Sequence, residues 1–354
     1  MNPAKEKSHE AERGRSVREH AFRTRLLAWY DTHARELPWR RDRNPYRVWA
    51  SEIMLQQTRV AAVIAHYQEF LRRFPTVGKL ARAREASVLA AWSGLGYYRR
   101  ARMLHAAAKV VMRELGGKFP ATAEGWRALP GIGRYTAAAI ASIAFGEAVA
   151  VVDGNVERVL QRVSGQRMAG EELWRAAERL LDRERAGDFN QALMELGATV
   201  CTPRAPACVT CPVVELCTTR GEMAGAAKAR RQKKLEIHYA LDWRSQNGEG
   251  GAVFLVRRAR DARMMAGMWE LPELAGVLRA SENQSKGPLF TVRHSITVTD
   301  FTVRVWRLAA RSGTRGEWVA VERLGRVALT GLARKILRKA GVMVATGRGR
   351  ALRG

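Results

Sequence analysis

Hydrophobic residues recur every three or four positions through most of residues 21–200, a spacing that predicts helices. The pattern is clearest in AFRTRLLAWYDTH, VAAVIAHYQEFLRRF, ARMLHAAAKVVMREL and ELWRAAERLLDRE. Glycine and proline separate these segments, and no ladder of alternating strands interrupts them. We therefore expect a compact all-helical domain over residues 21–220. Residues 1–20 are polar with charges of both signs, which predicts a disordered tail.

The hydrophobic period changes in the last third of the chain. Residues 221–234, GEMAGAAKARRQKK, are small and basic and predict a linker. β-branched and aromatic residues then dominate GGAVFLVRRA, PLFTVRHSITVTDFTVRVWRLAA and GEWVAV, which predicts strands, and VALTGLARKILRKAG is typical of a helix. We expect a smaller α+β domain over residues 235–345 and a basic tail over residues 346–354.

The charge of the chain points to an anionic partner. Its 354 residues include 61 lysines and arginines against 34 acidic residues, a net charge of +27. Such a field attracts nucleic acid through phosphate contacts and counterion release, although a generic arginine-rich protein has the same excess. No uncharged apolar run has the length of a membrane span, and the first residues lack the apolar core of a secretory signal. We expect a monomer without membrane contact, located in the cytoplasm of a bacterial cell and associated with the nucleoid.

All four cysteines of the chain lie in one short segment, with the spacing C-x6-C-x2-C-x5-C. They are Cys201, Cys208, Cys211 and Cys217. A tight cluster in such a protein favours metal binding over a disulfide framework. Four thiolates suit either zinc or a [4Fe–4S] cluster. Zinc ribbons usually offer two C-x2-C pairs and this segment has one, so the spacing favours the iron–sulfur cluster, with zinc and free thiols as alternatives.

Residues 129–140, LPGIGRYTAAAI, predict a tight turn between two helices. Gly131 and Gly133 would expose backbone N–H groups at the start of the second helix, where a phosphate can bind. The same glycines also fit a plain helix–helix turn.

Two carboxylates stand in contrasting surroundings. Asp153 follows the apolar run AVAVV and precedes the helical pattern GNVERVLQRV, so it fits a helix N-cap, where the helix dipole keeps it ionised. Glu52 lies among apolar residues in VWASEIMLQQT, which would raise its pKa and suit a general acid. Such a pair fits cleavage of an N-glycosidic bond, in which one group protonates the departing base and the other stabilises an oxocarbenium-like sugar. Each residue also fits an ordinary structural position on a helix.

Together these motifs resemble the helix–hairpin–helix DNA glycosylases of the endonuclease III superfamily. LPGIGRYTAAAI, VVDGNVERVL and the cysteine spacing carry the resemblance, and LPWR, PYRVWASEIMLQQTRV, GLGYYRRARMLH and FNQALMELGATVC are similar to the adenine DNA glycosylase branch. The resemblance covers about residues 22–220. It implies a helix–hairpin–helix domain with a [4Fe–4S] loop that acts on double-stranded DNA. The implied reaction removes adenine mispaired with 8-oxoguanine or guanine, after the base is flipped out of the duplex.

The resemblance also implies roles for single residues. Glu52 would protonate adenine and Asp153 would stabilise the cationic sugar. The residues implied to assist these two or to contact DNA are Tyr135 and Asn155 beside the carboxylates, Gln57, Leu95 and Tyr97 as wedges in the duplex, Gly131 and Gly133 in the hairpin, and Arg40 and Gln191 in the adenine pocket.

Two alternatives compete with this interpretation. A bifunctional glycosylase and lyase needs a lysine on the second helix of the hairpin to form a Schiff base, and the corresponding position here is Tyr135. A monofunctional glycosylase is therefore expected. The second alternative is a non-catalytic DNA-binding protein that carries an iron–sulfur cluster.

The C-terminal domain resembles the Nudix-like module that recognises 8-oxoguanine in this family, through GAVFLVRRARDARMMAGMWELPEL. SENQSK stands where Nudix hydrolases have an acidic segment that binds magnesium, so the resemblance implies recognition rather than pyrophosphate hydrolysis. The family's lesion-reading loop is commonly Phe-Ser-His, whereas Val292-Arg293-His294 and then Ser295 stand here. We expect Arg293, His294 and Ser295 to take part in lesion recognition.

Overall fold

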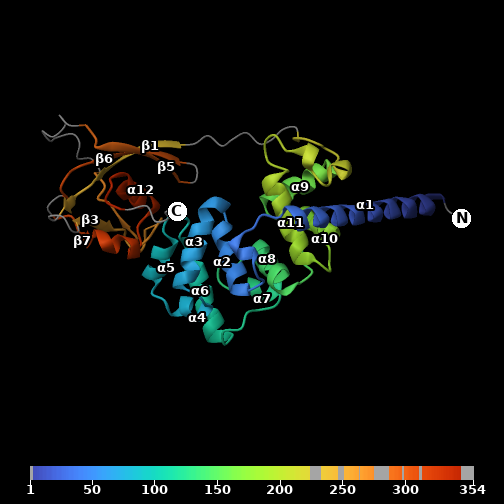
Figure 1. Cartoon of the computed structure of the whole chain (residues 1–354), viewed down its shortest axis with the longest axis horizontal. Helices are drawn as coiled ribbons and strands as arrows, with labels where there is room; N and C mark the ends of the chain where they lie inside the picture. Colours follow the sequence, from blue (N-terminus) through green and yellow to red (C-terminus); the bar gives the residue numbers. More distant parts are fainter. Residues whose placement is uncertain are drawn as a thin grey trace, which may run out of the picture. The chain divides into compact units, whose positions relative to one another are not determined.

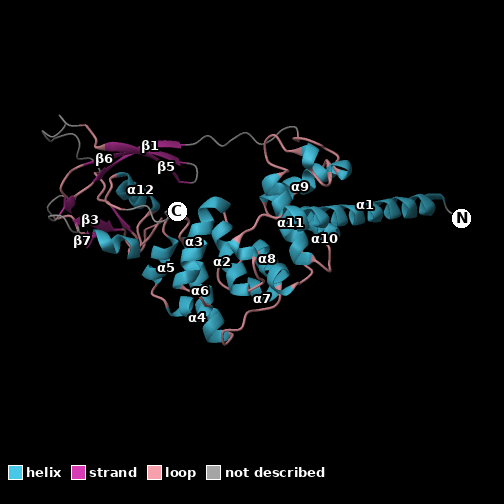
Figure 2. Cartoon of the chain, in the orientation of Figure 1, coloured by secondary structure: helices cyan, strands magenta, loops and turns pink. Residues whose placement is uncertain are grey.

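The computed structural model describes residues 3–223, 233–245, 251–262, 264–274, 287–296, 299–310 and 313–343. Figure 1 and Figure 2 show helices through the first two thirds of the chain and the strands in the last third. By their packing, the residues form two compact units. The first consists of Met1–Gln57, Thr76–Gly78 and Ala106–Ala227, and the second consists of Thr58–Pro75, Lys79–His105 and Lys228–Gly354.

This division differs from the predicted one. Residues 21–220 were expected to form one domain, but Thr58–Pro75 and Lys79–His105 pack with the C-terminal part of the chain. Helical periodicity shows that a segment has a face to bury, but it does not show which partner covers that face.

The first unit is helical. Its elements are α1 (Pro3–His33), η1 (Pro38–Arg40), α2 (Pro45–Leu55), α7 (Ala123–Arg127), α8 (Arg134–Phe145), α9 (Gly154–Ser164), α10 (Gly170–Leu180), α11 (Ala186–Thr199), η2 (Cys208–Thr210) and η3 (Val214–Leu216). Helix α6 (Arg99–Glu114) begins in the second unit and ends in the first.

The core of the first unit is built on aromatic pairs. Trp49 on α2 and Trp126 on α7 are fully buried, with ring centroids 5.4 Å apart. Phe22 on α1 meets Phe189 on α11 edge to face at 6.4 Å. Burial of such large side chains supplies most of the driving force for packing these helices together.

Helices α9 and α11 approach each other unusually closely at a glycine. A Cβ added to Gly197 on α11 would lie 2.6 Å from the Cβ of Asn155 on α9. Only glycine allows this approach, and the approach places the start of α9 against the last turn of α11.

The prediction of a disordered tail over residues 1–20 is wrong from Pro3 onward, because α1 begins there. The segment is rich in alanine, glutamate, lysine and arginine, which have high intrinsic helix propensity. Contacts with the cysteine segment also hold α1: Arg18 donates to the carbonyl of Leu216 at 2.6 Å, and Arg25 forms an ion pair with Glu215.

The second unit contains both helices and strands. Its helices are α3 (Val60–Arg73), most of α4 (Val77–Arg82), α5 (Glu85–Trp92), the start of α6, η5 (Val321–Arg326) and α12 (Gly331–Lys339). Phe70 on α3 and Trp92 on α5 are fully buried and meet edge to face at 6.0 Å.

Two sheets form the C-terminal part of this unit. In the first sheet, β6 (Thr299–Trp306) lies between β1 (Lys233–Ala240), which is parallel to it, and β5 (Phe290–Ile296), which is antiparallel. In the second sheet, β3 (Gly251–Arg257) pairs antiparallel with β2 (Trp243–Ser245), β4 (Trp269–Glu270) and β7 (Glu317–Ala320). Strands and a final helix were both expected here, but β1 starts at Lys233, inside the predicted linker 221–234. The predicted tail 346–354 lies outside the described residues.

The core of the C-terminal part follows the alternation of its strands. Val253 and Leu255 on β3 are buried together with Val303 and Val305 on β6, and Ile336 on α12 packs with them. Alternating residues of a strand point to opposite faces, so one face of each sheet is apolar and packed.

Strand β5 is at the edge of its sheet, and α12 covers part of that edge. Lys335 donates from Nζ to the carbonyl of Arg293 at 2.6 Å, and Lys339 donates to the carbonyl of Thr291 at 2.8 Å. Within the described part of the chain, we find no helix with both the length and the apolar character needed to cross a bilayer.

Candidate active site

Helices α2 and α8 bring a glutamate and a tyrosine together in the first unit. Glu52 lies in the last turns of α2, with 5% of its surface exposed. The hydroxyl of Tyr135, in the first turn of α8, donates to Oε2 of Glu52 at 2.9 Å. The hairpin turn before α8 therefore sets where this hydroxyl meets the buried carboxyl group.

The surroundings of Glu52 favour its protonated form. Burial raises the pKa of Glu52 from 4.5 to about 7. The hydrogen bond from Tyr135 lowers this pKa, the negative charge of Asp153 raises it, and the positive charge of Arg40 lowers it. A carboxylic acid with a pKa near neutrality can hold a proton and also release it, which is the requirement for a general acid.

Asp153 is the N-cap of α9. Its Oδ1 accepts from the backbone N–H of Asn155 at 2.8 Å and of Val156 at 2.7 Å, and its Oδ2 accepts from Nδ2 of Asn155 at 3.0 Å. Three N–H donors at the start of α9 hold the carboxylate in one orientation. The site thus holds two carboxyl groups in opposite environments, near enough for the charge of Asp153 to affect Glu52.

Arg158 connects this carboxylate to the cysteine segment. Its Nη2 donates to Oδ1 of Asn155 at 2.8 Å and to the carbonyl of Gly197 at 2.7 Å. Its Nε donates to the carbonyl of Cys201 at 2.7 Å. Asn155 is therefore held on one side by Arg158 while it donates to Asp153 on the other.

Arg40 and Arg35 both pair with Glu195, whose side chain is 1% exposed. Nη2 of Arg40 donates to Oε2 of Glu195 at 2.9 Å, and Arg35 donates to both oxygens of Glu195 at 2.6 and 2.9 Å. Burial raises the pKa of Glu195, but the hydrogen bonds from the two arginines outweigh burial and lower it. Gln191, the other predicted pocket residue, lies half-buried one turn earlier on α11.

The hairpin has the geometry that its glycines predict. Gly131 is exposed and has a φ of 75°, which favours glycine, and Gly133 is the exposed N-cap of α8. The first N–H groups of α8 lack helical partners, so this end of the helix is suited to an anion.

The four cysteines line one small, mostly apolar cavity. The other residues around it are Val159, Arg162, Val163, Leu196, Val200, Pro206, Val213, Val214, Arg220 and Gly221. Nη1 of Arg162 lies 3.3 Å from Sγ of Cys201, and the backbone N–H of Arg220 lies 3.4 Å from Sγ of Cys217. Among the described residues, no three His, Cys, Asp or Glu side chains are arranged to hold a metal ion.

Two of the predicted wedge residues lie on one turn of the second unit, after α5. Leu95 is buried there, whereas Tyr97 is exposed and has a φ of 46°. The guanidinium carbon of Arg100 lies 5.4 Å from the centre of the Tyr97 ring. The third, Gln57, is exposed at the end of α2 in the first unit, with a φ of 55°.

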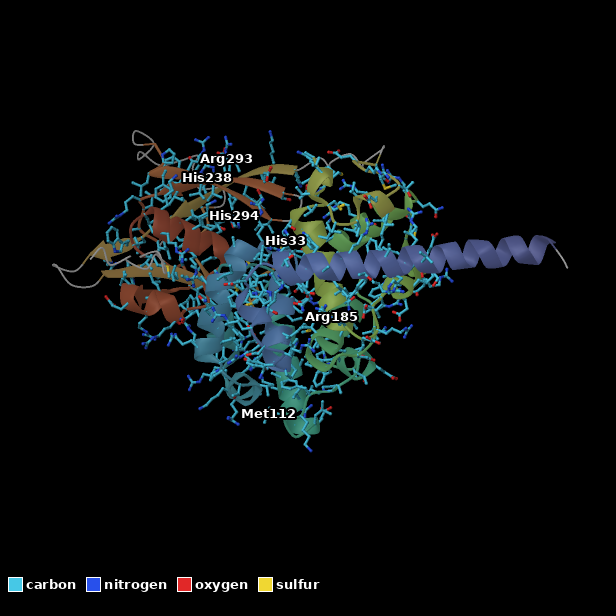
Figure 3. All side chains as sticks on the ribbon, turned by 45° about the vertical axis from the view of Figure 1, so that its right-hand side comes forward. His33, Met112, Arg185, His238, Arg293 and His294 are labelled. Atoms are coloured by element: carbon cyan, nitrogen blue, oxygen red, sulfur yellow. The ribbon has the colours of Figure 1, made fainter. Side chains whose placement is uncertain are left out.

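The three predicted lesion-reading residues do not share a face of β5. Arg293 and Ser295 are exposed, whereas His294 is half-buried on the opposite face with Val292 (Figure 3). The hydroxyl of Ser295 lies 2.5 Å from Oδ1 of Asp300 on β6. Burial lowers the pKa of His294, and the positive charge of Lys335 lowers it further.

Comparison with known proteins agrees with this geometry. A family model described as HhH-GPD superfamily base excision DNA repair protein matches residues 50–182. The human adenine DNA glycosylase is 42% identical over 313 residues, covering 72% of this chain and 57% of the human protein. The adenine DNA glycosylase of Buchnera aphidicola subsp. Schizaphis graminum is 36% identical over 231 residues, covering 63% of this chain and 67% of that protein. The chain belongs to the adenine DNA glycosylase family.

A solved structure extends the match to the fold. A thermostable thymine-DNA glycosylase is 31% identical, with a TM-score of 0.55, and the match covers 58% of this chain and 97% of that one. The resemblance to the family and the expected helix–hairpin–helix fold are thus confirmed. The chain spans 57%, 60% and 64% of the lengths of the human, mouse and rat relatives.

Several residues that build this site were not found from the sequence. They are Arg35, Arg158, Arg162 and Glu195. By pattern, a loop arginine such as Arg35 and a glutamate and arginines on amphipathic helices are ordinary surface residues. The only local signal was Arg158, which follows Asn155 by one helical turn and so shares its face.

Proposed function

We propose that the chain is a monofunctional DNA glycosylase that hydrolyses the N-glycosidic bond of adenine mispaired with 8-oxoguanine or guanine in double-stranded DNA. The observation that carries this proposal is the buried Glu52, whose pKa is raised to about 7 beside Asp153, a carboxylate held by three N–H donors. Family membership supports the same reaction.

In the proposed reaction, Glu52 gives its proton to a ring nitrogen of adenine. The bond between the sugar C1′ and the base then breaks, and its electron pair leaves with adenine. The carboxylate of Asp153 stabilises the positive charge on the sugar. Water adds to C1′ and its proton returns to Glu52, so the products are free adenine and an abasic site. Tyr135 orients the Glu52 carboxyl group, and Asn155 orients Asp153.

The lyase alternative is less well supported. The position of the required lysine is Tyr135, and its hydroxyl is engaged with Glu52. The hairpin, residues 129–140, has no lysine that could form a Schiff base.

The cysteine cavity supports the proposal of a [4Fe–4S] cluster. Arg162 is 5% exposed, and its guanidinium contacts Sγ of Cys201 and the carbonyls of Thr202 and Pro203. A buried cation requires a compensating anion, and four thiolates around a cluster would provide one. The cluster would be held by Cys201, Cys208, Cys211 and Cys217. Its bonds to these cysteines would cross-link residues 201–217, the cysteine segment, just after the end of α11.

Four further groups of residues are proposed to contact DNA. The hairpin N–H groups after Gly131 would bind a phosphate, and Leu95 and Tyr97 would wedge into the duplex with Gln57. The C-terminal sheets are proposed to form a Nudix-like module that reads 8-oxoguanine, with Arg293 and Ser295 on the exposed face of β5. Arg40 and Gln191 are proposed to contact the adenine.

The test uses a labelled duplex with one adenine opposite 8-oxoguanine. Incubation followed by heating in alkali should give a single break at the adenine, and untreated DNA should stay intact. Glu52→Gln should abolish the break while the affinity for the duplex is retained. If wild-type protein leaves no abasic site, the proposed reaction is wrong, and a break without alkali would support the lyase.

A further inference from the structure

The turn that carries Leu95 and Tyr97 has an unusual backbone. We call residues 93–98 the wedge turn. Gly94 has a φ of 115° and Gly96 a φ of 70°, and Tyr97 is one of the few non-glycine residues with a positive φ, 46°. Such a conformation is costly for tyrosine and persists only where surrounding contacts hold it.

Contacts from neighbouring helices hold the middle of the wedge turn. Nε1 of Trp92 donates to the carbonyl of Gly96 at 3.1 Å. Nη2 of Arg100 donates to the carbonyls of Leu95 at 3.2 Å and of Gly96 at 3.3 Å. These contacts come from residues adjacent to the turn in sequence, so they shape the turn without joining it to the rest of the unit.

The two ends of the turn bind a single carbonyl group far away in the sequence. The hydroxyl of Ser93 donates to the carbonyl of Leu329 at 2.7 Å, and the hydroxyl of Tyr98 donates to the same oxygen at 3.2 Å. Ser93, Tyr98 and Leu329 are all buried, at 3%, 5% and 0% exposure. A buried oxygen that accepts hydrogen bonds from both hydroxyls fixes the distance between the two ends of the wedge turn.

The C-terminal strands fix this carbonyl in turn. The backbone N–H of Trp269 on β4 donates to the carbonyl of Ala328 at 2.9 Å, and the N–H of Thr330 donates to the carbonyl of Trp269 at 2.9 Å. Leu329 lies between these two bonds. The wedge turn is therefore connected to strand β4 through Leu329, which bridges to Trp269.

Arg334 reinforces the same contact. Its Nε donates to the hydroxyl oxygen of Ser93 at 2.9 Å, so this hydroxyl donates to Leu329 and accepts from Arg334. Arg334 is 8% exposed, and the charged or titratable side chains that act on it among the described residues are Arg338, Tyr98 and Arg73, with no carboxylate among them. Burying a cation without an opposite charge is unfavourable, so the contact with Ser93 is maintained at a cost in stability.

We propose that the C-terminal part of the chain positions the wedge turn through a clamp formed by the carbonyl of Leu329 and the guanidinium of Arg334 on Ser93 and Tyr98. Ser93, Tyr98 and Arg334 are positioning residues that act through Leu95 and Tyr97. The role in excision rests on the proposed function, whereas the clamp itself does not.

The clamp is tested first without DNA, by hydrogen exchange. The amide of Leu95, which donates to the carbonyl of Trp92 at 3.1 Å, reports opening of the turn. Ser93→Ala and the milder Tyr98→Phe should each raise its exchange rate about three- to tenfold, while amides in the middle of α8 keep their rates. Arg102→Met is the matched control, because the side chain of Arg102 donates to Glu85 and to the carbonyl of Ala266 rather than to either end of the turn, and the substitution keeps the backbone N–H that bonds the carbonyl of Tyr98.

The outcomes of the exchange test are distinct. An increase at Leu95 in both variants, with none in the control, supports the clamp. An unchanged rate in both variants, or an equal increase in the control, overturns it. Because Tyr98→Phe removes only one hydroxyl, it keeps the test valid if Ser93→Ala does not fold.

A double-mutant cycle then tests the link to excision. Ser93→Ala should lower the single-turnover rate of adenine excision in wild-type background and have no further effect in a Leu95→Ala/Tyr97→Ala background, because it acts through those residues. Additive effects would overturn this link. If wild-type protein excises no adenine but the exchange result is as expected, the proposed function fails and the clamp stands. If it excises adenine and the exchange rates do not change, the clamp fails alone.

Discussion

Arg158 donates a hydrogen bond of 2.8 Å to the side-chain oxygen of Asn155 and simultaneously binds the carbonyl of Cys201. Asn155 can then direct its amide N–H only toward Asp153. The orientation of the carboxylate therefore depends on the position of the first cysteine, although the cysteine cavity and the carboxylate do not touch.

Replacing Arg158 should reduce excision more than it reduces DNA binding. Arg158→Gln removes the bonds that orient Asn155, and misplacement of a catalytic group by such a loss can lower the rate by up to about 100-fold. Single-turnover kinetics with the adenine–8-oxoguanine duplex measure the effect. Arg175→Ala, at an exposed position of α10, is the control. Equal rates in the two variants would contradict the positioning role.

Excision should depend on pH through Glu52. With a pKa of about 7, Glu52 carries its proton below that pH and loses it above, so the rate should fall as pH rises through about 7. Tyr135→Phe removes a hydrogen bond that lowers this pKa. The fall should therefore move to higher pH, by about one unit. A profile with the same midpoint in both proteins would show that the Tyr135 contact does not control the proton.

Glu52→Gln should abolish excision and stabilise the fold at alkaline pH. The native pKa of Glu52 lies above its ordinary value of 4.5, so the native state binds more protons between about pH 4.5 and about pH 7. The free energy of unfolding falls as pH rises through this window, by up to roughly 3 kcal/mol. Glutamine has no charge to bury. Denaturant unfolding at about pH 8 should therefore give a larger free energy of unfolding for the variant than for wild type, and unfolding below about pH 4.5 should not.

The cysteine segment should require its metal group for stability. We expect purified protein to contain iron and inorganic sulfide in equal amounts, with broad visible absorption. Cys208→Ser should lose both and melt at a lower temperature, because the cross-linked segment also binds α1 through Arg18. A colourless wild-type protein with stoichiometric zinc would contradict the iron–sulfur assignment.

Substitutions on the two faces of β5 should have different effects. Ser295→Ala, on the exposed face, should reduce the preference for 8-oxoguanine over guanine opposite adenine and leave the melting temperature within about 2 °C of wild type. His294→Ala, on the half-buried face, should instead lower the melting temperature. The test measures the excision rate of each variant on duplexes with 8-oxoguanine or guanine opposite adenine, together with its melting temperature.

The sequence predicted those parts of the site that depend on local pattern. The surroundings of Glu52 in VWASEIMLQQT and the position of Asp153 before GNVERVLQRV indicated the burial of one carboxyl group and the capping role of the other. The contact between Arg35 and Glu195 spans 160 positions, and the Arg158 bond to Cys201 spans 43. Periodicity contains no information about such pairs, because it describes the residues of one helix and not the contacts between distant segments.

The division of the chain into two packed units was harder to predict from the sequence for the same reason. The helices were found, but the packing of Lys79–His105 with the C-terminal strands depends on hydroxyl and carbonyl contacts such as that of Ser93 with Leu329. The tail prediction failed for another reason, since polar composition was interpreted as disorder although Ala, Glu and Arg favour a helix.

The lysines of α12 give β5 a property unrelated to lesion recognition. An edge strand offers free carbonyl groups to which a strand of another molecule can add, and such addition begins aggregation. Lys335 and Lys339 already occupy the carbonyls of Arg293 and Thr291 and place two positive charges along that edge. A second copy would have to displace both ammonium groups before it could pair. Helix α12 therefore also protects the edge of β5 against pairing with a strand of another molecule.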